Sequence, residues 1–260
     1  GDLVDAQSAT TAQQDPHRIQ ARPSLIVRMR KAELVVCTGA GLEAGWLPLL
    51  LRRANNPRVQ PGQAGHLEAV TAVALLDRPS RLDRAEGDIH AQGNPHIQTN
   101  PHNLALVAQV IAERLSLIDP DHAQRYQTTL DDFLTRWHAA IGRWEQAAIP
   151  LRGKTVVVQH RSWVYLNQWL GLEQVATIES KPGVPPGSGH LARLVSRLEQ
   201  QPADVIIRAA YQGDAGARWL SERTGIRQVA LPFTVGGSKA ASDLFGLFDD
   251  TVKQLLAAVQ

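Results

Sequence analysis

The sequence predicts an α/β protein of two lobes, each with a mainly parallel sheet, joined by one long rigid helix. Three observations support this fold class. Apolar strands alternate with helices of about ten residues, which is typical of parallel sheets. This alternation restarts after residue 150, and an unbroken helical pattern lies between its two parts. We therefore expect an N-terminal lobe at 1–118, a connecting helix at 119–149 and a C-terminal lobe at 150–260.

The first lobe begins with alternating strands and helices. The predicted elements are a weakly alternating strand at 3–10, a helix opened by Pro23, a buried strand at 33–39, a helix at 46–54 and a helix at 101–117. Proline opens a helix well because its missing N–H has no partner in the first turn. Residues 55–95 are rich in Pro, Gly and Asn, apart from a possible short helix near 68–76. We expect a long surface loop there.

The connecting helix has the clearest periodic pattern. Asp119 and Pro120 supply a capping residue and a first-turn proline. Apolar residues then recur every three or four positions, at Tyr126, Leu130, Phe133, Leu134, Trp137, Ile141 and Trp144. This spacing places them on one helical face. Such a helix would be about 40 Å long at 1.5 Å per residue and would act as a rigid spine.

The second lobe repeats the alternation more regularly. Strands are predicted at 154–160, 175–180, 203–210 and 227–233, with helices at 163–171, 190–201, 217–225 and 242–259. Gly171 and Gly225 end two of these helices, as glycine does at helix C-termini.

The composition excludes several classes of protein. The net charge is only +2 and the basic residues are scattered, which argues against a nucleic-acid partner. The single cysteine, Cys37, permits neither an internal disulfide nor a cysteine-based zinc cluster, and its apolar neighbours predict an inert core thiol. The longest apolar runs, such as 46–51, are too short to span a bilayer. The opening GDLVDAQSATT reads as the middle of a domain, so we expect a processed or truncated start.

Three histidines have similar settings in separate units. His17 follows Asp15 and Pro16, His96 follows Asn94 and Pro95, and His160 ends a buried strand. Proline fixes the turn before the first two, and strand ends deliver ligand residues in open α/β sheets. Taken singly, each is more often a surface or core histidine than a ligand. Three imidazoles that converge are what zinc prefers, so the sequence predicts a metal site.

Several segments together resemble a known family. They are DPHRIQARPS (15–24), RKAELVVCTGAGLEAGWLPLLL (30–51), GNPHIQTNPHN (93–103), the DPDHAQRYQTTLDDF segment and VVVQHRSWVYLNQWLGL (156–172). In this order they resemble the cluster A-I metal-binding proteins, which are extracytoplasmic receptors of zinc and manganese ABC importers. The resemblance implies that His17, His96 and His160 bind the metal. It also implies a periplasmic (or extracytoplasmic, membrane-associated) location and an ABC transporter membrane permease as the partner. We expect a monomer that is not an enzyme.

The sequence departs from the family pattern at several points. Gln98 and Asn100 replace a usual Trp and Asp, which should affect only local packing. Many relatives supply an aspartate ligand from the last strand, where this chain reads LPFTVGG (231–237) without a carboxylate. The fourth ligand is then water, Glu179, Asp214 or His90. The family's usual first strand and following helix also have no counterpart at the N-terminus, so the first lobe could lack an element.

The metal and the function have alternatives. Three imidazoles favour Zn²⁺ as the transported ligand, whereas Mn²⁺ sites usually contain more carboxylate oxygen. A three-histidine site also suits a mononuclear zinc hydrolase, although no general base is adjacent in the sequence. A third class is an adhesion or metal-sequestering protein without a transporter.

Other candidate residues are weaker. The glycine-rich GAGLEAG (39–45) only partly matches the dinucleotide-binding fingerprint, so we do not expect NAD binding. His66 lies in the predicted long loop. The remaining histidines are expected in solvent, and they are His102, His122, His138 and His190.

Overall fold

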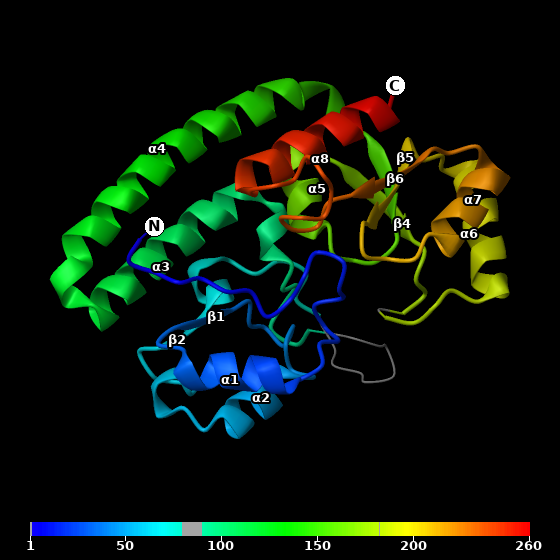
Figure 1. The fold of residues 1–260 in the computed structure, drawn as a ribbon. Helices are drawn as coiled ribbons and strands as arrows, with labels where there is room; N and C mark the ends of the chain where they lie inside the picture. Colours follow the sequence, from blue (N-terminus) through cyan, green and yellow to red (C-terminus); the bar gives the residue numbers. More distant parts are fainter. Residues whose placement is uncertain (1, 80–89, 182) are drawn as a thin grey trace.

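The computed structural model describes residues 2–79, 90–181 and 183–260, and within them the strands form two separate sheets. Both sheets are parallel, with two strands in the N-terminal lobe and four in the C-terminal lobe. The long helix α4 (Ala123–Ala147) extends from one lobe to the other (Figure 1). The predicted fold class is therefore confirmed.

The N-terminal lobe contains most of the predicted elements. They are α1 (Pro23–Lys31), β1 (Val35–Cys37), α2 (Leu47–Ala54), β2 (His66–Glu68) and α3 (Pro101–Ile118). The helices α1 and α2 pack against each other, with Leu25 and Leu50 in a small core that also contains Ile19 and Cys37. Asn100 caps α3 by accepting a hydrogen bond from the backbone N–H of His102. The Asn that replaces the family's usual Asp at this position therefore keeps the capping function.

Two sequence predictions for this lobe are wrong. Residues 3–10 do not form a strand, because residues 2–8 are exposed to solvent and no strand among the described residues pairs with them. The predicted long loop at 55–95 contains the short strand β2, which pairs with β1. The possible short helix near 68–76 is present as the 3₁₀ helix η2 (Ala69–Ala72). Residues 80–89 of that loop lie outside the described residues.

The spine helix buries the predicted face. Its buried residues include Tyr126, Trp137, Ile141 and Trp144, while its other sides are largely exposed. It packs against α3 near its start and against α8 (Leu244–Ala258) farther along (Figure 1). Asp119 does not cap it directly, because the 3₁₀ helix η5 (Pro120–His122) comes first. The Asp119 carboxylate instead accepts a hydrogen bond from the Tyr126 hydroxyl.

The C-terminal lobe has the predicted alternation. Its remaining elements are β3 (Thr155–Val158), α5 (Val164–Leu170), β4 (Glu173–Thr177), α6 (Ser188–Gln200), β5 (Val205–Ala209), α7 (Ala215–Thr224) and β6 (Gln228–Leu231). The strand order is β4-β3-β5-β6. Alternate residues of β3 enter two cores: Val156 and Val158 pack with α4, α5 and α8, while Val157 packs with α6 and α7. Both faces of the central strands are therefore buried.

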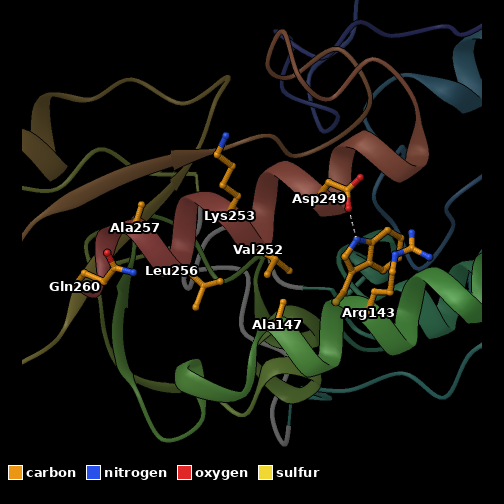
Figure 2. Close-up of a pocket in the computed structure, with 9 residues that line it drawn as sticks. Arg143, Ala147, Asp249, Val252, Lys253, Leu256, Ala257 and Gln260 are labelled. Atoms are coloured by element: carbon orange, nitrogen blue, oxygen red, sulfur yellow. Dashed lines mark hydrogen bonds between the residues drawn. The ribbon is translucent and has the colours of Figure 1, made fainter.

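An open groove of about 490 Å³ lies between α4 and α8 (Figure 2). Val252 and Leu256 give it an apolar wall, and Trp144 Nε1 donates a hydrogen bond to Asp249 Oδ1 at 2.6 Å. None of the histidines singled out above lines this groove. Within the described residues, no helix is long and apolar enough to cross a membrane.

Candidate metal centre

Three histidines from different parts of the chain meet between the lobes. One ring nitrogen from each of His17, His96 and His160 lies within 4.8 Å of the corresponding nitrogens of the other two. His17 follows the turn at Asp15, His96 immediately precedes the 3₁₀ helix η4 (Ile97–Thr99), and His160 follows β3. The ring centroids of the three pairs are 5.2, 5.7 and 5.8 Å apart. The structure thus brings all three sequence-predicted metal ligands together.

Carboxylates fix the orientation of two of these rings. Asp15 Oδ1 lies 2.8 Å from His17 Nδ1, and Glu179 Oε2 lies 2.8 Å from His160 Nδ1. An ionised carboxylate can only accept a hydrogen bond, so each Nδ1 carries the proton. Nε2 of His160 is then left for a metal, and Nε2 of His17 faces Nε2 of His90 at 3.3 Å. Burial raises the pKa of Asp15, but hydrogen bonds and charge from His17 outweigh it and hold that pKa below 3.8.

His96 has no hydrogen-bond partner on its ring among the described residues. Both ring nitrogens are buried and unpaired, and the side chain is 0% exposed. Burial lowers the pKa of His96 well below 6.5, and the neighbouring His160, His17 and His90 lower it further. The ring is therefore neutral and keeps a free lone pair. Leaving a buried polar group unpaired costs about 1–3 kcal/mol, and a bound metal would satisfy one of these nitrogens.

The backbone around the histidines links the two lobes. Asn94 Oδ1 accepts a hydrogen bond from the N–H of His96, and its Nδ2 donates to the carbonyl of Arg161 at 2.6 Å. The Arg161 side chain makes two hydrogen bonds to the carboxylate of Asp77, at 2.6 and 3.2 Å. The residues beside His96 are therefore tied to the residue that follows His160.

The candidates for a fourth ligand lie in different environments. Glu179 is already hydrogen-bonded to His160 and to the N–H of Gly183. Asp214 precedes α7 and pairs with Arg218. His90 adds a nitrogen donor, with its Nε2 3.3 Å from His17 Nε2. The LPFTVGG segment places the Phe233 ring 5.5 Å from the His96 ring.

The other histidines are bonded or exposed elsewhere. His66 Nδ1 contacts the carbonyl of Val59, His102 pairs with Glu145, and His122 pairs with Asp119. His190 contacts the carbonyl of Thr177 and is partly buried, whereas His138 is exposed as predicted. None of these residues belongs to the three-histidine group.

Two other sequence features have structural explanations. Glu43 accepts hydrogen bonds from the N–H groups of Thr38 and Gly39, so a carboxylate fills the glycine-rich turn where a dinucleotide fold would bind phosphate. Cys37 is buried, and burial with the nearby Glu43 and Glu68 raises its pKa to about 12. This agrees with a core thiol rather than a reactive one.

Sequence reasoning did not identify the orienting role of Asp15 or Glu179. The signal for Asp15 was its position two residues before His17 in the same turn. Glu179 follows β4, which neighbours β3 in the sheet, so its carboxylate lies beside His160. Asp15 and Glu179 therefore each orient one of the three grouped histidines.

Comparisons with known proteins identify the family to which this chain is similar. The model of a family described as zinc-uptake complex component A, periplasmic, matches residues 1–258. The high-affinity zinc uptake system protein ZnuA of Yersinia pestis is 26% identical over 237 residues, which cover 83% of this chain and 72% of that protein. The manganese ABC transporter substrate-binding lipoprotein scaA of Streptococcus gordonii is 27% identical over 239 residues, which cover 90% of this chain and 74% of that protein.

Solved structures have the same fold. A crystal structure of ZnuA has a TM-score of 0.80 at 22% identity and covers 100% of this chain and 92% of its own. A manganese-bound periplasmic metal-binding protein from Candidatus Liberibacter asiaticus has a TM-score of 0.78 at 15% identity, with 100% and 92% coverage. At these identities the likeness concerns the fold alone.

Proposed function

The chain belongs to this family of periplasmic components of zinc-uptake complexes, and we propose that it captures Zn²⁺ between its lobes and delivers it to the membrane permease of an ABC importer. The observation that carries the proposal is His96, whose two buried ring nitrogens lack partners beside His17 and His160. A buried neutral imidazole with a free lone pair is suited to metal binding.

The choice of zinc over manganese depends on the donor atoms. Three imidazole nitrogens form the centre of the site, and its carboxylates bond to the rings from outside. Manganese favours oxygen ligands, whereas zinc binds imidazole well. We therefore propose that His17, His96 and His160 bind zinc. His17 and His160 would bind it through Nε2. Manganese would bind more weakly.

The proposal includes location and organisation. The chain would act as a monomer outside the cytoplasmic membrane, as a binding protein rather than an enzyme. We further propose lobe boundaries at 118/119 and 149/150, so that α4 carries both lobes while small shifts of lobes and loops admit and release the ion. The long, well-packed spine supports this, because it leaves little room for a hinge.

A titration tests the ligand assignment. We expect one zinc ion per chain, and we expect His17→Ala, His96→Ala and His160→Ala each to weaken zinc binding at least about tenfold because each removes a ligand. His102→Ala is the matched control, since that exposed histidine pairs with Glu145 away from the site. Competition with a chromophoric chelator gives the affinities, and circular dichroism checks folding. Wild-type affinity in all three variants would refute the assignment.

The delivery step needs a separate test. Zinc uptake into membrane vesicles that contain the partner ABC permease should require the binding protein. It should fail with the His160→Ala variant. Zinc binding without any dependence of uptake on the chain would favour a metal-sequestering or adhesion protein instead.

A further inference from the structure

We propose that His90 is the fourth ligand of the metal and completes a four-imidazole site with His17, His96 and His160. This inference rests on the proposed function, because it concerns the same ion. Among the candidates for that position, it selects His90 over water, Glu179 and Asp214. The donor would come from the N-terminal lobe rather than from the last strand of the C-terminal lobe.

The geometry between His90 and His17 supports this assignment. Their Nε2 atoms are 3.3 Å apart, and their rings are stacked with centroids 5.3 Å apart. A tetrahedral zinc with Zn–N bonds of about 2.0–2.1 Å separates its nitrogen ligands by about 3.3–3.4 Å. Because Asp15 occupies Nδ1 of His17, the nitrogen that faces His90 is the one left for the metal. The pair thus already has the spacing of two ligands on one ion.

The His90 ring lies farther from the His96 ring than from the His17 ring. Its ring centroid is 6.1 Å from that of His96, and its nitrogens do not join the group that lies within 4.8 Å of one another. We therefore expect the His90 ring to move toward His96 when the ion binds. The turn after β1 borders the ring on the other side, where a Cβ added to Gly41 would lie 3.7 Å from His90 Nδ1.

The alternative donors are committed to other contacts. Glu179 holds His160 and the Gly183 N–H, and Asp214 pairs with Arg218. On the side of the last strand, the nearly buried Phe233 packs its ring against His96. Phe233 therefore gives the site an apolar neighbour on that side. His90 is then the described side chain best placed to supply a fourth nitrogen.

A site of four imidazoles has a consequence for metal choice. Without an oxygen donor it should discriminate strongly against manganese, which prefers carboxylate and water ligands. Loss of His90 would open one position to water. Zinc binding should then weaken, while manganese binding should change little or improve. His90 is therefore predicted to set the ratio of the two affinities.

X-ray absorption of the zinc-loaded full chain tests the ligand count. We expect four imidazole nitrogens in the wild type, and three with one oxygen in His90→Ala. Chelator competition should show zinc affinity reduced at least about tenfold in His90→Ala and in His90→Gln, with manganese affinity unchanged within about threefold. His102→Ala serves as the control, and circular dichroism confirms that the variants fold.

The outcomes separate this inference from the proposed function. If His17→Ala, His96→Ala and His160→Ala lose zinc while His90→Ala keeps wild-type affinity and an unchanged absorption spectrum, the four-imidazole site is refuted and the proposed function stands. If the wild type itself binds no zinc, the proposed function fails. A wild-type spectrum with an oxygen as the fourth donor also overturns the inference.

Discussion

Glu179 Oε2 lies 2.8 Å from His160 Nδ1 and also accepts a hydrogen bond from the N–H of Gly183 at 2.9 Å. One oxygen of the Glu179 carboxylate thus contacts both groups. Asp15 does the same for His17, because its Oδ1 also accepts the backbone N–H of His17. Each lobe therefore presents one histidine whose tautomer and direction are fixed before an ion arrives.

Removal of the Glu179 carboxylate should weaken metal binding without removing a ligand. We expect Glu179→Ala to lower zinc affinity by about 10–100-fold, the usual cost of losing a partner of a metal-bound histidine. Glu179→Gln should lose less, since its amide oxygen can still accept from Nδ1. Glu173→Ala, at an exposed position of β4, is the control. Chelator competition gives the affinities, and equal values for all four proteins would contradict the orienting role.

Zinc binding should depend on pH. An imidazole must be neutral to bind zinc, and its ordinary pKa is about 6.5. We therefore expect affinity to fall steeply below about pH 6, because protons compete for the ring nitrogens. His96 should contribute least to this competition, since burial and its histidine neighbours hold its pKa well below 6.5. Competition titrations from pH 5 to 8 measure the effect, and a flat profile would show that histidines are not the ligands.

The metal-free protein should also become less stable in acid. His96 has a lowered pKa when folded, so below pH 6.5 the unfolded chain binds a proton that the folded chain does not. Its contribution to stability is complete above pH 6.5 and is lost as pH falls toward the lowered pKa. The slope is at most about 1.4 kcal/mol per pH unit for one proton. Urea unfolding of metal-free wild type and His96→Leu checks this, and the variant should show a shallower dependence.

Zinc should stabilise the folded chain and should not make it a hydrolase. A ligand that binds only the folded state adds about 4 kcal/mol at a thousandfold excess over its dissociation constant. We expect a clear rise in melting temperature with zinc in the wild type and little rise in His96→Ala. No ester, phosphate or peptide should be cleaved. Turnover that disappears in His160→Ala would favour the hydrolase alternative.

The ion pair between the lobes should slow metal release. Arg161 binds Asp77 through two hydrogen bonds, although both side chains are partly exposed. Partly exposed pairs contribute about 0.2–1 kcal/mol, which corresponds to a rise in dissociation rate of up to about fivefold in Arg161→Ala. Arg136→Ala, which breaks an exposed pair within α4, is the control. Stopped-flow transfer of zinc to a chelator gives the rates; equal rates for both variants would argue against a role for this pair.

The sequence predicted much of the C-terminal lobe because its signals are local. Short apolar runs identify β3 and β5, helical spacing identifies the preceding α4, and glycines mark the ends of α5 and α7. The three metal-ligand candidates were also accessible, since a proline turn or a strand end positions each one. These features depend on residues that are close together in the chain.

Long-range features could not be predicted in the same way. The strand β2 has only three residues, and its formation depends on pairing with β1. The alternation at 3–10 failed as a signal because no partner strand exists for it among the described residues. Glu179 was considered as a ligand, but its orienting contact depends on the order of β4 and β3 in the sheet. The short distance between His90 and His17 could be seen only in the folded structure.

The small core of α1 and α2 has a consequence for how the site opens. Ile19, two residues after His17, belongs to this core, and Trp46 of the same core donates a hydrogen bond from Nε1 to the carbonyl of Pro16. The spine and the larger sheet share a separate and more extensive core. Regions with fewer buried contacts unfold locally at lower free energy. Amide hydrogen exchange should therefore be faster in α1 and α2 than in α4 or β3, and brief local unfolding there would detach His17 while the rest of the chain stays folded.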